Sequence, residues 1–230
     1  MAEIISRNVS LGECEVFSLQ TKKSQGQDIL LLHGAKFQAA TWKKLKTLDR
    51  LDDVGYKPHA IDLPGFGKSP RCAVAHETVL QWFIQKQNLS RPVLVGASMS
   101  GRISLDFSMR YPEIVGGLVL IGAVGVRERS EQLDTIRAPC LILWGSNDTV
   151  APLASAHLLH DRIPGAELRI FDNASHPCYL DQPDRWHQEL LAFLHKKLKI
   201  PCCKQRGMRS LDRFKAFKED DGDRQKQRAD

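Results

Sequence analysis

The chain alternates short apolar runs with longer stretches in which apolar residues return every three or four positions. The short runs are typical of strands buried on both faces, and the longer periodic stretches are typical of amphipathic helices. The first two segments, Glu3–Gly12 and Cys14–Thr21, alternate apolar and polar residues, which predicts an antiparallel hairpin. Buried strands are predicted at Asp28–Leu32, Pro58–Ile61, Val93–Val95, Gly116–Val126, Cys140–Trp144 and Glu167–Phe171. Helices are predicted at Thr41–Val54, Glu77–Asn88, Ser100–Tyr111, Pro152–Ile163 and Asp184–Leu198.

This order of elements predicts an α/β fold. Strands and helices that alternate after a hairpin imply a mostly parallel, twisted sheet with helices on both faces. The connector Arg127–Arg137 is short and polar, so it leaves room for one helix at most. We therefore expect no sizeable lid domain and an open site. The folded domain is predicted over residues 1–199, and the charged residues 200–230 are predicted to be a disordered tail.

Composition and charge narrow the class of protein. A chain of 230 residues with 42% hydrophobic and 26% charged residues fits one globular domain. No apolar run approaches the ~20 residues of a membrane span, and Met1–Ser10 lacks the features of a signal peptide, which predicts a cytoplasmic protein. The net charge is +6, and nine basic against six acidic residues in Pro201–Asp230 supply half of it. Since no basic stripe is interleaved with aromatic residues, nucleic acid is not an expected partner.

The six cysteines show neither C-x-x-C nor cysteine-histidine spacing, so no metal site is expected. They are also few for a disulfide scaffold of this length, which favours reduced thiols. Cys202 and Cys203 stand beside Lys204 and Arg206. They are either two free thiols of the tail or an S-acylation site that docks the protein on a membrane.

The stretch Pro92–Gly101 predicts a strand that turns into a helix around Ser98. Such a turn crowds its neighbours, so small residues flank the serine and its backbone is strained. The hydroxyl then stands near a helix N-terminus, where free N–H groups can hold an oxyanion. The usual pattern is G-x-S-x-G, but here Ser100 stands at the second glycine position and Gly101 follows one place later.

Three polar residues, Ser98, Asp148 and His176, follow predicted strands in the order nucleophile, acid, base. Singly, each has a plain interpretation as a turn serine, a turn aspartate or a polar loop histidine. Together, at strand ends that meet at one edge of the sheet, they predict a catalytic triad. Ser98 would be the nucleophile, His176 the general base and then acid, and Asp148 the residue that orients His176. The backbone N–H groups of Met99 and Ala35 would form the oxyanion hole.

Two further residues compete for a catalytic role. His33 follows a buried strand and precedes Gly34, a position that favours shaping the loop over catalysis. Asp62 is an alternative acid, but it opens the run Asp-Leu-Pro-Gly-Phe-Gly, in which its side chain is expected to bind backbone N–H groups.

The motifs across Ile29–Leu198 resemble the α/β-hydrolase superfamily, with a serine in place of the nucleophilic aspartate of dehalogenases and epoxide hydrolases. Four runs are similar to the α/β-hydrolase-domain protein 14 family: Leu30–Gly34, Ala60–Gly65, Ser98–Gly101 and His176–Asp181. In that family, serine at the second glycine position is a trait. The tail beyond Leu198 has no match in the family pattern.

The resemblance implies a protein of cytosol and nucleus that hydrolyses small acyl esters. It also implies removal of acetyl groups from protein lysines, with transfer to coenzyme A. No phosphate-binding motif is visible, so Lys36, Lys68 and Arg102 are only candidates for binding coenzyme A. Two alternatives stay open: a non-catalytic interaction protein, such as a partner of the transcription machinery, and a cofactor-free perhydrolase that uses the same triad.

Overall fold

One eight-stranded sheet organises the described residues, which in this computed structural model are 2–22 and 25–197. Its order is β1-β2-β4-β3-β5-β6-β7-β8. The pairs β1–β2 and β2–β4 are antiparallel, and every other pair is parallel. This confirms the predicted α/β fold. The strands are β1 (Ile4–Leu11), β2 (Cys14–Thr21), β3 (Asp28–Leu32), β4 (Lys57–Ile61), β5 (Val93–Ala97), β6 (Gly117–Ile121), β7 (Cys140–Gly145) and β8 (Glu167–Phe171).

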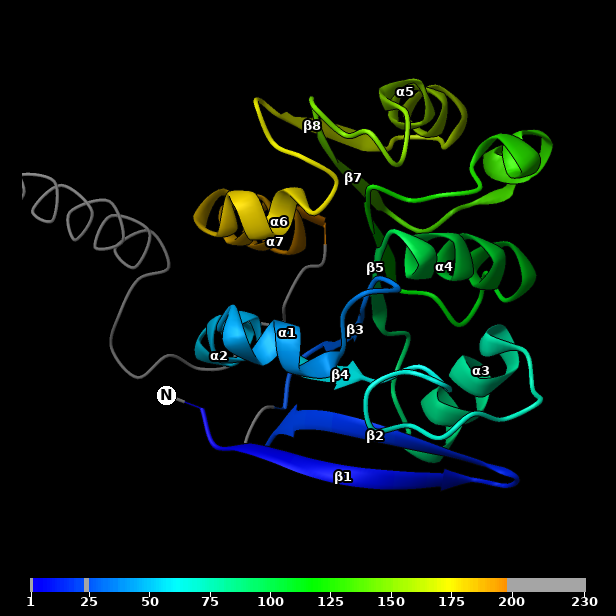
Figure 1. Cartoon of the computed structure of the whole chain (residues 1–230), viewed down its shortest axis with the longest axis vertical. Coiled ribbons are helices and arrows are strands. Elements are labelled where there is room, and N and C mark those ends of the chain that lie inside the picture. Colours follow the sequence, from blue (N-terminus) through cyan, green and yellow to red (C-terminus); the bar gives the residue numbers. More distant parts are fainter. Residues whose placement is uncertain (1, 23–24, 198–230) are drawn as a thin grey trace, which may run out of the picture. The chain divides into compact units, whose positions relative to one another are not determined.

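Helices cover both faces of the sheet. Figure 1 shows α1, α2, α6 and α7 on one face, and α3, α4 and α5 on the other. Their bounds are α1 (Ala39–Lys44), α2 (Thr47–Asp53), α3 (His76–Lys86), α4 (Met99–Arg110), α5 (Leu153–Arg162), α6 (Cys178–Asp181) and α7 (Pro183–Lys197). Between the two layers, every residue of β3, β5, β6 and β7 is buried, because helices on both sides remove these apolar strands from water.

Two predicted elements differ from the structure. The predicted helix Thr41–Val54 is wrong as a single element: it is split into α1 and α2 at Lys46, whose φ of 60° is left-handed and cannot continue a helix. The predicted strand Gly116–Val126 ends at Ile121 as β6, because Gly122 and Gly125 have φ of 53° and 69° and turn the chain away from the sheet.

The connector between β6 and β7 contains one short element, the 3₁₀ helix η1 (Arg127–Thr135). The guanidinium of Arg129 holds it on α4 through a two-point ion pair with Asp106, and also donates to the carbonyl of Gly125 at 2.7 Å. This ion pair raises the pKa of Arg129. The connector therefore holds no lid domain, as its short and polar sequence predicts.

A disulfide joins Cys14 to Cys72, so the expectation that all the cysteines are reduced is wrong. The two residues are 58 positions apart, and it is the antiparallel pairing of β2 with β4 that brings the hairpin turn beside the loop after β4. Cysteine spacing carries no information about such a pairing. Cys140 and Cys178 are buried free thiols. Since disulfides persist mainly in oxidising compartments, the thiol argument for a cytosolic location no longer holds.

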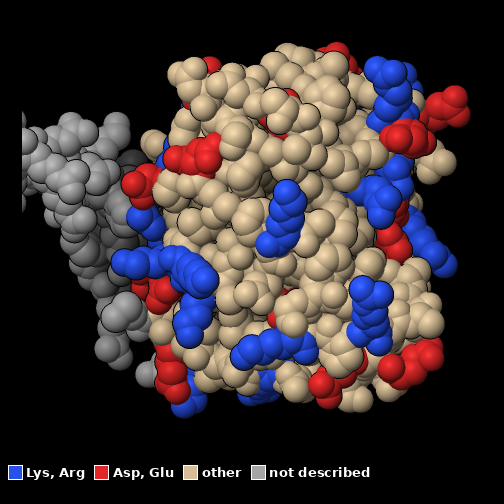
Figure 2. All heavy atoms as spheres, viewed as in Figure 1, with Lys and Arg blue, Asp and Glu red and all other residues tan. Residues whose placement is uncertain are grey.

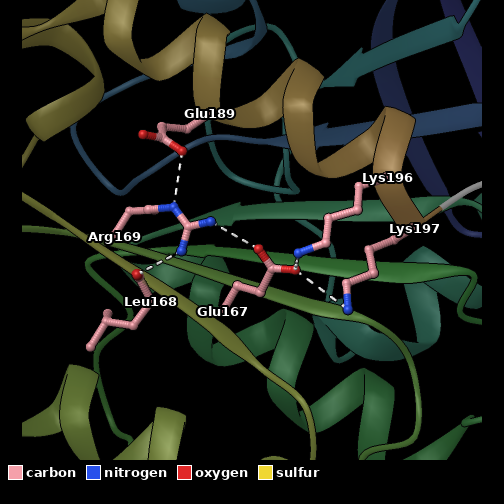
Figure 3. Close-up of polar contacts among 6 residues, drawn as sticks. All are labelled: Glu167, Leu168, Arg169, Glu189, Lys196 and Lys197. Carbon is pink, nitrogen blue, oxygen red and sulfur yellow. Dashed lines mark hydrogen bonds and ion pairs between the residues drawn. The ribbon is translucent and has the colours of Figure 1, made fainter.

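A cluster of charged residues fastens the last turn of α7 to the edge strand β8. Figure 3 shows the Glu167 carboxylate between the Arg169 guanidinium and the ammonium groups of Lys196 and Lys197. Arg169 also pairs with Glu189 at 3.1 Å. The two lysines hold the pKa of Glu167 below its usual range, so this carboxylate is ionised at neutral pH. The helix end and the strand are thus joined by several ion pairs at once.

On the face drawn in Figure 2, basic and acidic side chains are mixed near the rim, and few of either kind lie in the middle. Within residues 2–22 and 25–197, no helix has the length and apolar character needed to cross a membrane. The predicted tail, with Cys202 and Cys203, lies outside the described residues.

Candidate active site

Ser98 occupies a strained turn between β5 and α4. Its φ of 55° and ψ of −112° lie outside the regions that non-glycine residues usually adopt, and its N–H donates to the carbonyl of Ile121 at 2.8 Å. Two glycines make the turn possible. A Cβ at Gly96 would lie 2.5 Å from the Ser100 carbonyl oxygen, and one at Gly101 would lie 2.7 Å from the Cβ of Ala123. The predicted crowding around the serine is therefore present in the structure.

Ser100 explains why this chain departs from the usual glycine pattern. The residue is fully buried, and its hydroxyl accepts a hydrogen bond from the Ala97 N–H at 2.9 Å. The same hydroxyl can donate to the Leu32 carbonyl at 2.9 Å or to the Ala97 carbonyl at 3.0 Å. A serine at this position therefore fits the space and also links the turn to the end of β3.

The side chains of Ser98, His176 and Asp148 form one hydrogen-bonded chain. His176 Nε2 lies 2.7 Å from Ser98 Oγ, and His176 Nδ1 lies 2.8 Å from Asp148 Oδ2. Because a carboxylate can only accept, Nδ1 carries the proton, and Nε2 is left to accept from the serine hydroxyl. The Asp148 side chain is fully buried, whereas His176 is 16% exposed. The three residues predicted as a triad are thus brought together with the geometry that proton transfer needs.

Neighbouring loops fix the acid and the base. Asp148 Oδ1 accepts from the N–H groups of Val150 and Ala151, each at 2.8 Å, so this carboxylate cannot turn away from His176. The loops after β7 and β8 are bonded to each other, since the Asn147 N–H donates to the carbonyl of Ala174 at 2.9 Å. The acid and the base are therefore held by one connected pair of loops.

Asp181 is a residue of the site whose role was not predicted from the sequence. Its Oδ2 accepts from both the N–H and the hydroxyl of Ser175, each at 2.6 Å, directly before His176. Its signal in the sequence is the run from His176 to Asp181, one of the four runs that carry the family resemblance. The contact makes Asp181 a positioning residue for the loop that carries the base.

The two N–H groups predicted for the oxyanion hole belong to Ala35 and Met99. Met99 is the first residue of α4, where N–H groups lack helical partners, and Ala35 lies in the turn closed by the bond from the Phe37 N–H to the Gly34 carbonyl. Among the described residues the structure gives neither N–H an acceptor. Their role in holding an oxyanion remains a prediction.

His33 and Asp62 both bind backbone groups. His33 is fully buried, with Nδ1 2.8 Å from the Gly34 carbonyl and Nε2 accepting from the Leu63 N–H at 3.1 Å. Burial lowers its pKa, so the imidazole is neutral at pH 7. The two Asp62 carboxylate oxygens accept from the N–H groups of Ala39 and Lys68 at 2.6 and 2.8 Å. These contacts occupy both side chains in shaping loops.

The space beside Ser98 is small, although the connector after β6 holds no lid domain. It has a volume of about 10 Å³, and its walls include the rings of Phe37 and Tyr179 together with Ile121 and Pro177. Lys36, Lys68 and Arg102, the candidates for binding coenzyme A, do not line it. The ammonium of Lys68 lies instead 4.7 Å from the centre of the Phe17 ring.

Comparisons with known proteins identify the family and the fold. Residues 29–135 match the model of the alpha/beta hydrolase fold family. ABHD14B of Rattus norvegicus, provisionally named a protein-lysine deacylase, is 32% identical over 79% of this chain and 91% of its own length. ABHD14A of Mus musculus is 37% identical over 73% of this chain and 70% of its own length.

Among solved structures, the crystal structure of a predicted CIB-like hydrolase from Thermoplasma acidophilum is similar to this chain, with a TM-score of 0.82. The two are 25% identical in sequence, and the match covers 85% of this chain and all of the other. The two sequence relatives match this chain over most of its length, and both belong to the family that the motifs resemble. The chain therefore belongs to the α/β-hydrolase-domain protein 14 family of α/β hydrolases.

Proposed function

We propose that the protein is a serine-dependent acyl hydrolase that removes small acyl groups from esters or from acylated protein lysines. The hydrogen-bonded chain from Ser98 through His176 to Asp148 carries this proposal, since it links a nucleophile to a base at 2.7 Å and that base to an orienting carboxylate at 2.8 Å. The relatives named for protein-lysine deacylation support an acylated lysine as one substrate.

In the acylation step, Ser98 Oγ attacks the carbonyl carbon of the acyl group while His176 Nε2 takes the hydroxyl proton. The carbonyl oxygen becomes an oxyanion, which the N–H groups of Ala35 and Met99 would hold. When the bond to the leaving group breaks, His176 returns the proton to the alcohol oxygen or to the lysine nitrogen. Ser98 then carries the acyl group as an ester.

In the second step, His176 takes a proton from the acceptor as the acceptor attacks the acyl-serine carbonyl. The bond between the carbonyl carbon and Ser98 Oγ then breaks, and His176 returns the proton to that oxygen. Water as the acceptor releases a carboxylic acid, and the thiol of coenzyme A releases an acyl thioester. Transfer to coenzyme A is part of the proposal as an additional outcome of the same acyl-serine. The test for it is direct, because the two acceptors give different products.

The first experiment measures acyl release from p-nitrophenyl acetate and from an acetyl-lysine peptide, with and without coenzyme A. The variant is Ser98→Ala, and the matched control is Ser10→Ala, which removes the hydroxyl of an exposed serine on β1. Labelling with a fluorophosphonate probe runs in parallel, since it needs an activated serine but no known substrate.

We expect the wild type and Ser10→Ala to turn over the substrates and to react with the fluorophosphonate probe. Ser98→Ala should do neither. Formation of acetyl coenzyme A from the acetyl-lysine peptide would support transfer of the acyl group to coenzyme A. A wild type that neither turns over the substrates nor reacts with the probe would overturn the proposal and favour the interaction protein. Halogenation that depends on peroxide would instead favour the perhydrolase.

A further inference from the structure

We infer that Phe37 is the residue that limits the length of the acyl group that Ser98 accepts. The inference rests on the proposed function, because it concerns the substrate of the same serine. It arises from the walls of the 10 Å³ space beside Ser98, in which the two largest side chains are the rings of Phe37 and Tyr179.

The small space beside Ser98 is the place for the acyl group rather than for the leaving group. A lysine leaving group is attached to a protein, so it must extend from the site into solvent. The acyl group has no such attachment, and it must sit beside Ser98 Oγ with its carbon chain against the walls. The space is lined mainly by apolar groups, including Ile121, Ala97 and the two rings, which suits a hydrocarbon chain.

The volume sets a limit on that chain. About 10 Å³ is close to the smallest space that admits one water molecule, and a methyl group is of similar size. An acetyl group therefore fits with its methyl in the space. Each further methylene can stay inside the space only if a wall moves, and in a tight pocket one methylene changes kcat/KM by roughly 10- to 200-fold.

The two rings differ in how firmly they are held. Tyr179 is 2% exposed and stacks on Trp42, with ring centres 5.0 Å apart, and its edge also meets Trp186 at 6.3 Å. Phe37 is only half-buried, lies in a loop before α1, and meets Tyr179 edge-on at 6.3 Å. Tyr179 is thus a fixed wall, whereas Phe37 is the wall that a substitution can remove without opening the core.

The test is an acyl-length profile, measured as kcat/KM for p-nitrophenyl acetate, butyrate and hexanoate. The variants are Phe37→Leu and Phe37→Ala. The matched control is Tyr111→Ala, which removes another half-buried ring, one that packs on Phe107 at 4.9 Å and does not line the space. Thermal unfolding of each variant shows whether it folds.

We expect the wild type and Tyr111→Ala to prefer acetate over butyrate, which is longer by two methylenes, by about 100-fold or more. Phe37→Ala should lower this preference by at least about tenfold, chiefly by raising kcat/KM for butyrate, and Phe37→Leu should lie between. A wild type that hydrolyses acetate and hexanoate equally well overturns the inference while the proposed function stands. So does a folded, active Phe37→Ala with the wild-type profile. A wild type that hydrolyses none of the esters overturns the proposed function itself.

Discussion

The hydroxyl of Ser100 lies 2.9 Å from the carbonyl oxygen of Leu32, so the start of α4 is bonded to the end of the neighbouring strand β3. Ser100→Ala removes this bond and leaves the buried Ala97 N–H without its hydroxyl acceptor. We expect a loss of about 1–3 kcal/mol in the free energy of unfolding, measured by urea denaturation. The control is Ser108→Ala, another buried serine of α4, whose hydroxyl donates to the Ser104 carbonyl within the helix at 2.7 Å. An equal loss in both variants would contradict the linking role of Ser100.

Replacing the carboxylate of Asp148 tests whether the histidine must be held in one tautomer. Asp148→Asn keeps the shape of the side chain, but its amide can donate to His176 Nδ1 and so favours a proton on Nε2. On the proposed function, kcat for p-nitrophenyl acetate should fall by about 10⁴-fold, the loss known for this change in a serine protease. Asp172→Asn, at an exposed aspartate four positions before His176, should leave kcat unchanged. A fall of less than tenfold in Asp148→Asn would count against Asp148 as the orienting acid.

Asp181 should affect the rate through the position of His176 and not through contact with the substrate. Asp181→Asn weakens the two 2.6 Å bonds to Ser175, because an amide accepts less strongly than a carboxylate. On the proposed function, we expect a lower kcat for p-nitrophenyl acetate with little change in KM, and the same fractional loss in the rate of fluorophosphonate labelling. Asp181→Glu, which keeps the charge, should recover part of both rates. A rise in KM alone would contradict a positioning role.

The stability of the protein should fall as the pH drops from 6.5 to 4. Burial, helped by the positive charge of Arg50, lowers the pKa of His187 to about 4, and Nε2 of this imidazole lies 2.9 Å from Thr47 Oγ1. In this window the unfolded chain binds a proton that the folded protein does not, so acid favours unfolding by up to about 3 kcal/mol. The buried His33, whose pKa is also lowered, acts in the same direction.

The measurement is urea denaturation between pH 7.5 and 4.6. The range stops at pH 4.6 to limit the contribution of Asp28 and Glu167 to the measured dependence. The pKa values of both carboxylates are lowered in the folded protein, so the stability that they contribute is lost mainly at more acidic pH. His187→Gln should flatten the dependence of the unfolding free energy on pH, whereas the exposed His160→Gln should not. An unchanged slope in His187→Gln would show that other groups cause the dependence.

The Cys14–Cys72 disulfide closes a segment of 58 residues, so its loss should destabilise the protein. For a loop of this length, the entropy of the unfolded chain predicts about 4 kcal/mol, and measured values are often smaller. The variant is the pair Cys14→Ser and Cys72→Ser, compared with wild type by urea denaturation without reductant. Thiol alkylation of the denatured wild type, followed by mass spectrometry, should leave Cys14 and Cys72 unmodified. Modification of both would contradict the disulfide.

The sequence predicted those features that depend on local pattern. The strands of the parallel sheet are apolar throughout, and Ser98, Asp148 and His176 each follow such a strand, so their shared edge could be inferred. The break at Lys46 could not be inferred from the sequence, since the apolar stripe from Trp42 to Leu51 continues through it. The break is visible only in the backbone of Lys46, which has a left-handed conformation. The disulfide and the narrow space beside Ser98 depend on contacts between distant segments, and neither leaves a periodic mark in the sequence.

The separation of 78 residues between Ser98 and His176 has a consequence for protein synthesis. A chain leaves the ribosome from its N-terminus, so β5 and the serine emerge well before the loops that carry Asp148 and His176. Until β7 and β8 have joined the sheet, the Ser98 hydroxyl is an ordinary alcohol with no base beside it. On the proposed function, a half-made chain therefore cannot acylate itself from acyl donors in its surroundings, and reactivity arises only when the sheet is nearly complete.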